Sequence, residues 1–160
     1  MCILNWFKNL FNPVKRISED EKILEAAALL PSHIIDRILD RGAVIRWDSS
    51  LDSNIFACRA QDIFGNNFIL INYKYHSAPV EQIACLIGHE SCHVLEKTTL
   101  SEEVEAVMME MALWRTLKKA DVSYDNTALY RRLNKLSKMP YAEVKSYVAE
   151  SDFYKNILKV

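Results

Sequence analysis

The chain has 160 residues, half of them apolar and about a quarter charged, with a formal net charge of −1. This length and balance are typical of a single globular domain with its own hydrophobic core. The near-zero charge and the lack of a basic run argue against a nucleic-acid partner, and no apolar run is long enough for a transmembrane helix.

The first segment, residues 1–17, predicts a short amphipathic helix set apart from a main domain at residues 18–160. Its large apolar side chains recur at helical spacing within residues 3–11, and all its charged residues are basic. A secretory signal is not expected, because the apolar region is short and no small-residue cleavage site follows it. Three roles stay open: a helix packed on the domain, a helix lying in a membrane interface, or a segment that covers a cleft.

The cysteine pattern predicts free thiols in a reducing compartment. None of the four cysteines forms a C-x-x-C pair, and Cys85 and Cys92 would lie two turns apart on one helix, too far for a disulfide. We therefore expect a cytoplasmic protein. The four are Cys2, Cys58, Cys85 and Cys92.

Two short helices are predicted next, over residues 18–30 and 32–42. Ser18 can cap the first, and acidic residues follow it in the first turn, where the helix dipole favours them. Pro31 separates the two helices, and Gly42 is a suitable residue to end the second.

Three strands are predicted at residues 43–47, 54–59 and 67–73. Each is rich in apolar or β-branched residues, and the turn signal at Gly65-Asn66 precedes the third. Because the connections are short, we expect an antiparallel meander and hence a small antiparallel-rich sheet.

The helix predicted over residues 78–97 carries the pattern H-E-x-x-H at His89, Glu90 and His93. Histidines at i and i+4 leave a helix on the same face, which suits two nitrogen ligands on one Zn²⁺. Glu90 lies beside them without being a ligand, where it can take a proton from a water molecule activated by the metal. The pattern predicts a catalytic zinc site.

A third ligand is expected on the next helix, predicted over residues 101–119. No histidine follows His93, so the longer metzincin pattern is absent and a carboxylate is needed. Four acids on this helix are candidates: Glu102, Glu103, Glu105 and Glu110.

Among these acids the sequence favours Glu105. Its helical neighbours are all apolar, so we expect it to face the core, and a buried carboxylate needs a cation. These neighbours are Met108, Met109 and Ala112. Glu102 ranks second, since a first-turn acid has a separate reason in the helix dipole. Glu103 and Glu110 share a face that we expect to point to solvent. Two more helices, over residues 127–138 and 141–150, complete the chain.

Together these motifs resemble those of gluzincins, in particular the compact minigluzincins. The resemblance rests on Gly88–His93 and Ser101–Ala106 and covers about residues 43–118. It implies that the third ligand is Glu105 and that the strand at about residues 68–72 is the edge along which an extended peptide adds. It also implies that a terminal segment can block the cleft. Met109 stands where the thermolysin-like pattern has an aspartate, so the group that orients the ligands is unassigned.

The sequence thus predicts an α+β fold: a compact zincin-like domain in which a small sheet packs on the active-site helix, with helices at both ends of the chain. The predicted function is a zinc-dependent peptidase, a hydrolase acting on a peptide or protein substrate. His89, His93 and Glu105 would hold Zn²⁺, and Glu90 would be the general base.

Two points stay open at this stage. The donor for the tetrahedral oxyanion is one of several residues, namely Tyr73, Tyr75, His76 and Tyr130. The alternative function is a catalytically silent or latent zincin, acting as a zinc-stabilised binding or regulatory module, with residues 3–11 as a peripheral membrane contact.

Overall fold

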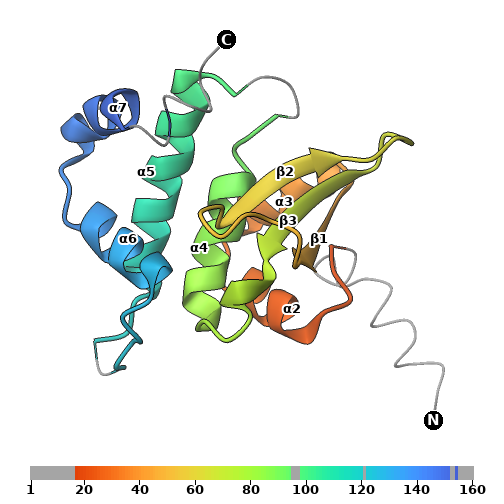
Figure 1. Ribbon diagram of the computed structural model, residues 1–160, viewed down its shortest axis with the longest axis horizontal. Coiled ribbons are helices and arrows are strands. Elements are labelled where there is room, and N and C mark those ends of the chain that lie inside the picture. The colour runs from red at the N-terminus through yellow and green to blue at the C-terminus, as the bar shows by residue number, and fades with distance from the viewer. Residues whose placement is uncertain (1–16, 95–97, 121, 152–153, 155–160) are drawn as a thin grey trace.

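The computed structural model describes residues 17–94, 98–120, 122–151 and 154, which form an α+β domain (Figure 1). In chain order its elements are α2 (Glu21–Ala28), α3 (Ser32–Asp40), β1 (Ala43–Asp48), β2 (Ala57–Gln61), β3 (Asn67–Asn72), the 3₁₀ helix η2 (Tyr73–Tyr75), α4 (Val80–Glu90), α5 (Leu100–Leu117), α6 (Ala128–Ser137) and α7 (Tyr141–Glu150). The predicted fold class is confirmed. The amphipathic segment predicted at residues 1–17 lies, apart from Ile17, outside the described residues.

The first two helices begin and end close to the predicted residues. Asp20, rather than Ser18, is the N-cap of α2, and its carboxylate accepts a hydrogen bond from the Ile23 amide at 3.0 Å. Pro31 precedes α3, and Gly42 follows it with a φ of 59°, a left-handed conformation that glycine adopts without steric cost. Within the described residues no helix is both long and apolar enough to cross a membrane.

The sheet is mixed, with strand order β1-β3-β2, so the predicted antiparallel meander is wrong. β3 lies in the middle, antiparallel to β2 and parallel to β1. The prediction that residues 68–72 form an edge strand is wrong for the same reason, because β1 and β2 are the two edges of this sheet.

The loop from β1 to β2 explains this order. β1 ends opposite Asn72, and β2 begins opposite Ile71, so the loop passes over the carboxyl end of β3 to its other side. The Asn72 side chain is buried and donates to the carbonyls of Asp52 and Ile55 at 2.9 and 2.8 Å, which fixes the loop there. The Asn72 side chain therefore holds the β1–β2 loop across the end of β3, so that β1 and β2 lie on opposite sides of β3 instead of next to each other.

The main core lies between the sheet and α4. On one face of the sheet Ile45, Ile69 and Ile71 are fully buried, as are Ile83 and Ile87 of α4. Helix α4 also packs against α2 and α5, while α6 and α7 cover the other side of α5 (Figure 1). A second cluster fills that space, made of Val107, Met111, Leu136, Val144, Val148 and Tyr154. Helix α4 thus lies in the middle of the domain, and almost all of its residues are buried.

Candidate metal site

Helix α4 presents His89 and Glu90 at its last two positions, and His93 follows in a tight turn. The helix was predicted to continue to residue 97, but it ends at Glu90. The amides of Cys92 and His93 bond three residues back, to the carbonyls of His89 and Glu90, which keeps the turn compact. The two imidazole rings therefore still lie together, with centroids 5.2 Å apart.

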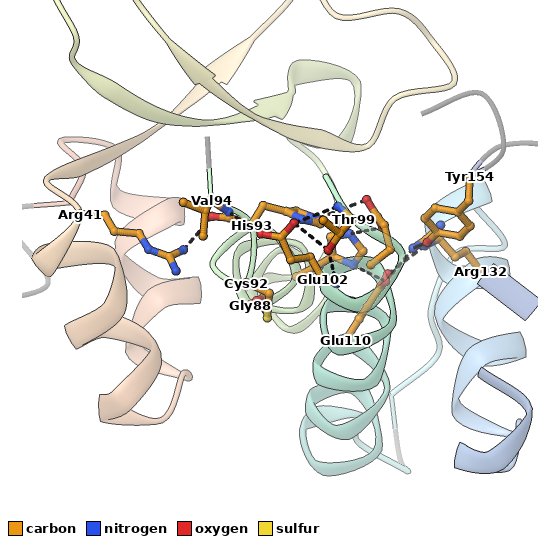
Figure 2. Close-up of polar contacts among 12 residues, drawn as sticks. Arg41, Gly88, Cys92, His93, Val94, Thr99, Glu102, Glu110, Arg132 and Tyr154 are labelled. Carbon is orange, nitrogen blue, oxygen red and sulfur yellow. Dashed lines mark hydrogen bonds and ion pairs between the residues drawn. The ribbon is translucent and has the colours of Figure 1, made fainter. Parts of the chain in front are cut away.

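Two side chains favour the early end of α4. The Ser91 hydroxyl donates to the Gly88 carbonyl at 2.7 Å, and Arg41 donates to the Ser91 carbonyl at 2.7 Å. Arg41 also donates to the His93 carbonyl at 2.7 Å (Figure 2). Carbonyls at a helix end need such partners, and Arg41 supplies them from the end of α3. Gly88 lets α5 come close here, because a Cβ at this position would collide with Leu113.

The third member of the cluster is Glu103 of α5. Its two carboxylate oxygens lie 3.8 Å from His89 Nε2 and 3.6 Å from His93 Nε2. Both distances are too long for a good hydrogen bond. They are closer to the separation of about 3.3 Å between two ligand atoms that each lie about 2.0–2.1 Å from a tetrahedral metal. His89, His93 and Glu103 are all buried and form a group that could hold a metal ion.

The structure places Glu105 away from this cluster, so the prediction that it faces the core is wrong. Its side chain is 57% exposed and pairs with Arg37 at 3.3 Å. The side of α5 that carries Glu105 is largely open to solvent, whereas the expectation that Glu103 and Glu110 face solvent is reversed, since both are buried. Glu102, ranked second, instead forms a capping box with Thr99.

Glu110 supplies the orienting group that the sequence left unassigned. It lies two turns beyond Glu103, and its carboxylate contacts His89 Nδ1 at 3.1 Å. Arg132 of α6 donates to both oxygens of Glu110, at 3.0 and 2.7 Å, and to the Tyr154 hydroxyl at 2.8 Å (Figure 2). Since Glu110 accepts, Nδ1 of His89 donates, and in the neutral ring the lone pair is on Nε2, facing Glu103.

The electrostatics of the cluster match these contacts. Burial lowers the pKa of His93 to about 4, which keeps this ring neutral and able to bind a metal at neutral pH. Burial also disfavours the charged form of His89, but the hydrogen bond and charge of Glu110 outweigh it and raise the His89 pKa. Burial raises the pKa of Glu103, and within the described residues Glu103 Oε2 has no hydrogen-bond partner. Such a carboxylate favours a cation beside it.

These residues line a cavity of about 200 Å³ between β2, α4 and α5. Glu90 is part of its wall, and burial raises the Glu90 pKa to about 7 although the charge of His89 opposes this. A carboxylate with a pKa near neutrality can both take up and release a proton at physiological pH. The cavity therefore combines a metal-binding group with a proton acceptor.

The four oxyanion donors suggested by the sequence do not line this cavity. Tyr73 and His76 stack on each other near Trp47, Tyr75 stacks on Phe56, and Tyr130 stacks on Tyr124. Other residues of the wall, missed from the sequence, carry donors, among them Arg59, Arg132 and Tyr154. These three come from β2, α6 and the C-terminal tail, and nothing local in the sequence relates these segments to the H-E-x-x-H motif.

Comparisons with protein-family models, curated proteins and solved structures find no match to this chain. The functional argument therefore rests on the geometry of the site.

Replacing Glu110 by Gln should weaken both zinc binding and the fold. Loss of a carboxylate that orients a histidine ligand typically lowers metal affinity by roughly 10- to 100-fold. The variant also leaves the buried Arg132 without its counter-charge, so we expect a free energy of unfolding about 3 kcal/mol lower at pH 7. Zinc titration and urea unfolding measure the two effects.

This stability difference should depend on pH. The Arg132 guanidinium and the bond to His89 outweigh burial and lower the Glu110 pKa from 4.5 to about 2. The carboxylate therefore stabilises the fold above about pH 4.5, and its contribution is lost as the pH falls toward 2. Glu143→Gln, at an exposed position on α7, is the control and should behave like wild type. An equal stability of Glu110→Gln and wild type at pH 7 would contradict this role.

Proposed function

We propose that this protein is a zinc-dependent peptidase of the gluzincin type. The observation that carries the proposal is the convergence of His89 Nε2 and His93 Nε2 on the Glu103 carboxylate, in a cavity whose wall includes Glu90. Two imidazoles and one carboxylate are the ligands of catalytic zinc sites that keep one position open.

In this proposal His89, His93 and Glu103 hold the zinc, and Glu103 replaces Glu105 as the third ligand. The donor set fits the ion, because Glu103 Oε2 has no hydrogen-bond partner within the described residues and lies 3.8 Å from His89 Nε2, which carries the lone pair. When bound, zinc supplies Lewis acidity that polarises a carbonyl and makes a water molecule more acidic.

Glu90 takes the proton of the attacking water and passes it to the leaving amine. Its raised pKa suits both steps. We assign stabilisation of the oxyanion to the Tyr154 hydroxyl, which lines the cavity. Burial raises the Tyr154 pKa, so the hydroxyl keeps its proton at neutral pH.

The substrate peptide would add along β2. This strand is an edge of the sheet, and its residues Ala57, Cys58 and Arg59 line the cavity. An edge strand offers unpaired backbone groups to an extended chain, which gives affinity without a particular side chain.

The small size of the cavity supports a second candidate, a latent or silent zincin that acts as a zinc-stabilised binding module. A volume of about 200 Å³ is smaller than that of most small-molecule sites, which have roughly 300–1,000 Å³. An extended substrate would then need the walls to open first. The suggested membrane contact through residues 3–11 lies outside the described residues.

Removal and return of zinc test the proposal. The purified chain is treated with a chelator, reloaded with one equivalent of Zn²⁺, and incubated with an unfolded protein substrate and a mixed peptide library, with cleavage followed by mass spectrometry. We expect cleavage only after reloading. If the reloaded protein cleaves nothing, the binding module is the better assignment.

A further inference from the structure

Arg59 places an unpaired guanidinium in the wall of the metal-site cavity. On β2 it pairs with Ile69 of β3, and cross-strand partners direct their side chains to the same face of a sheet. Ile69 is fully buried, so Arg59 points beneath the sheet toward α4. Each of its three guanidinium nitrogens exposes less than 1 Å² and has no hydrogen-bond partner within the described residues.

The other arginines around this site differ from Arg59 in having partners. Arg132 binds the Glu110 carboxylate, Arg41 binds two backbone carbonyls, and Arg37 binds Glu105. Each of these three has a structural role that its contacts explain, whereas the described part of the structure gives Arg59 none.

A charge buried in this way is costly for the folded protein. Burial lowers the Arg59 pKa and the nearby charge of Arg41 acts in the same direction, while Glu90 opposes them. Glu90 is nevertheless not within ion-pair distance of Arg59. A guanidinium remains charged in proteins, so a bound anion is needed to offset the cost of burying Arg59. The planar guanidinium matches a carboxylate, with which it forms two parallel hydrogen bonds.

We propose that Arg59 binds a carboxylate of the substrate beside the metal site, so that this cavity selects peptides with an acidic group near the cleaved bond. The group is either the C-terminal carboxylate of a short peptide or an Asp or Glu side chain. The proposal takes its substrate class from the proposed peptidase, but the binding of the carboxylate itself does not require zinc.

Peptide binding tests this selection. Labelled alanine-based peptides are prepared in four forms: a free acid, the matching C-terminal amide, and amides carrying one Glu or one Gln. Their affinities are measured by fluorescence anisotropy with the Glu90→Gln chain, both zinc-loaded and metal-free, so that no peptide is consumed. Comparison of the free acid with the Glu amide identifies the source of the carboxylate.

We expect one of the two acidic peptides to bind roughly 30-fold or more tightly than its neutral counterpart, since buried charge pairs contribute about this much. Arg59→Gln should abolish the preference in both metal states. Arg46→Gln is the matched control. Arg46 is an arginine of the same sheet, on β1, but its guanidinium lies over the Phe68 ring and does not line the cavity. It should retain the full preference.

Thermal unfolding keeps the test independent of peptide choice. Replacing an unpaired buried charge by an apolar side chain of similar length stabilises a protein, so Arg59→Met should raise the Tm by roughly 3 °C or more. Equal affinities for acidic and neutral peptides, no binding at millimolar peptide, or a fall in the Tm of Arg59→Met each overturn the proposal. If the binding preference is found but the zinc-loaded wild-type chain hydrolyses none of these peptides, only the peptidase assignment is overturned.

Discussion

Glu103→Gln is expected to lower the zinc affinity by roughly 100-fold or more, whereas Glu105→Gln should leave it unchanged. Glu103 faces both Nε2 atoms, and the loss of one of a few protein ligands removes a corresponding share of a binding free energy of about 10–16 kcal/mol. Glu105 is exposed and bound to Arg37. The two variants remove the same charge from the same helix, so they separate a ligand from a general electrostatic effect.

Competition with a chromophoric chelator measures both affinities. The metal-free Glu103→Gln protein should not lose stability, because the substitution removes a buried carboxylate oxygen that has no hydrogen-bond partner within the described residues. Zinc should therefore raise the Tm of wild type and of Glu105→Gln, and raise that of Glu103→Gln much less. A loss of affinity in Glu105→Gln alone would restore the ligand set predicted from the sequence.

Glu90→Gln is expected to lower the rate of peptide hydrolysis by roughly 100- to 10,000-fold, the usual contribution of a general base. Gln keeps the shape and one hydrogen-bonding oxygen of Glu but cannot accept the proton of the attacking water. Glu90 is not part of the His89–His93–Glu103 cluster, so the variant should bind zinc as tightly as wild type. Rates at saturating zinc with the same substrate measure the effect.

The control for this prediction is Glu102→Gln, which changes an acid at the N-terminus of α5 whose role is in the capping box. It should retain most of the activity. Undiminished hydrolysis by Glu90→Gln would exclude Glu90 as the base, and a parallel loss of zinc would mean that its role is structural.

Much of the fold could be predicted from periodicity and from the residues that begin and end elements. Helices α2, α3, α5, α6 and α7 lie within a few residues of their expected positions. The strand order could not be predicted, because it depends on Asn72, whose buried side chain binds a loop some twenty residues earlier in the chain. Such long-range hydrogen bonds leave no local pattern in a sequence.

The candidate site shows the same division between local and long-range information. The H-E-x-x-H spacing brought His89, Glu90 and His93 together as expected, even though α4 ends before His93. The prediction that Glu105 is buried was wrong, because the stripe of Met and Ala beside it predicts a core face but lies largely toward solvent. The buried face instead carries Glu103 and Glu110, and the charge of Glu110 is balanced by His89 on α4 and Arg132 on α6. An acid on a helix is therefore compatible with burial when other elements supply partners.

X-ray absorption at the zinc edge tests the central claim most directly. The wild-type chain is loaded with one equivalent of Zn²⁺ after chelation. We expect a spectrum with only nitrogen and oxygen neighbours at about 2.0–2.2 Å, including the outer-shell scattering of two imidazoles. Sulfur neighbours at about 2.3 Å, or the absence of imidazole scattering, would contradict a site formed by His89, His93 and Glu103.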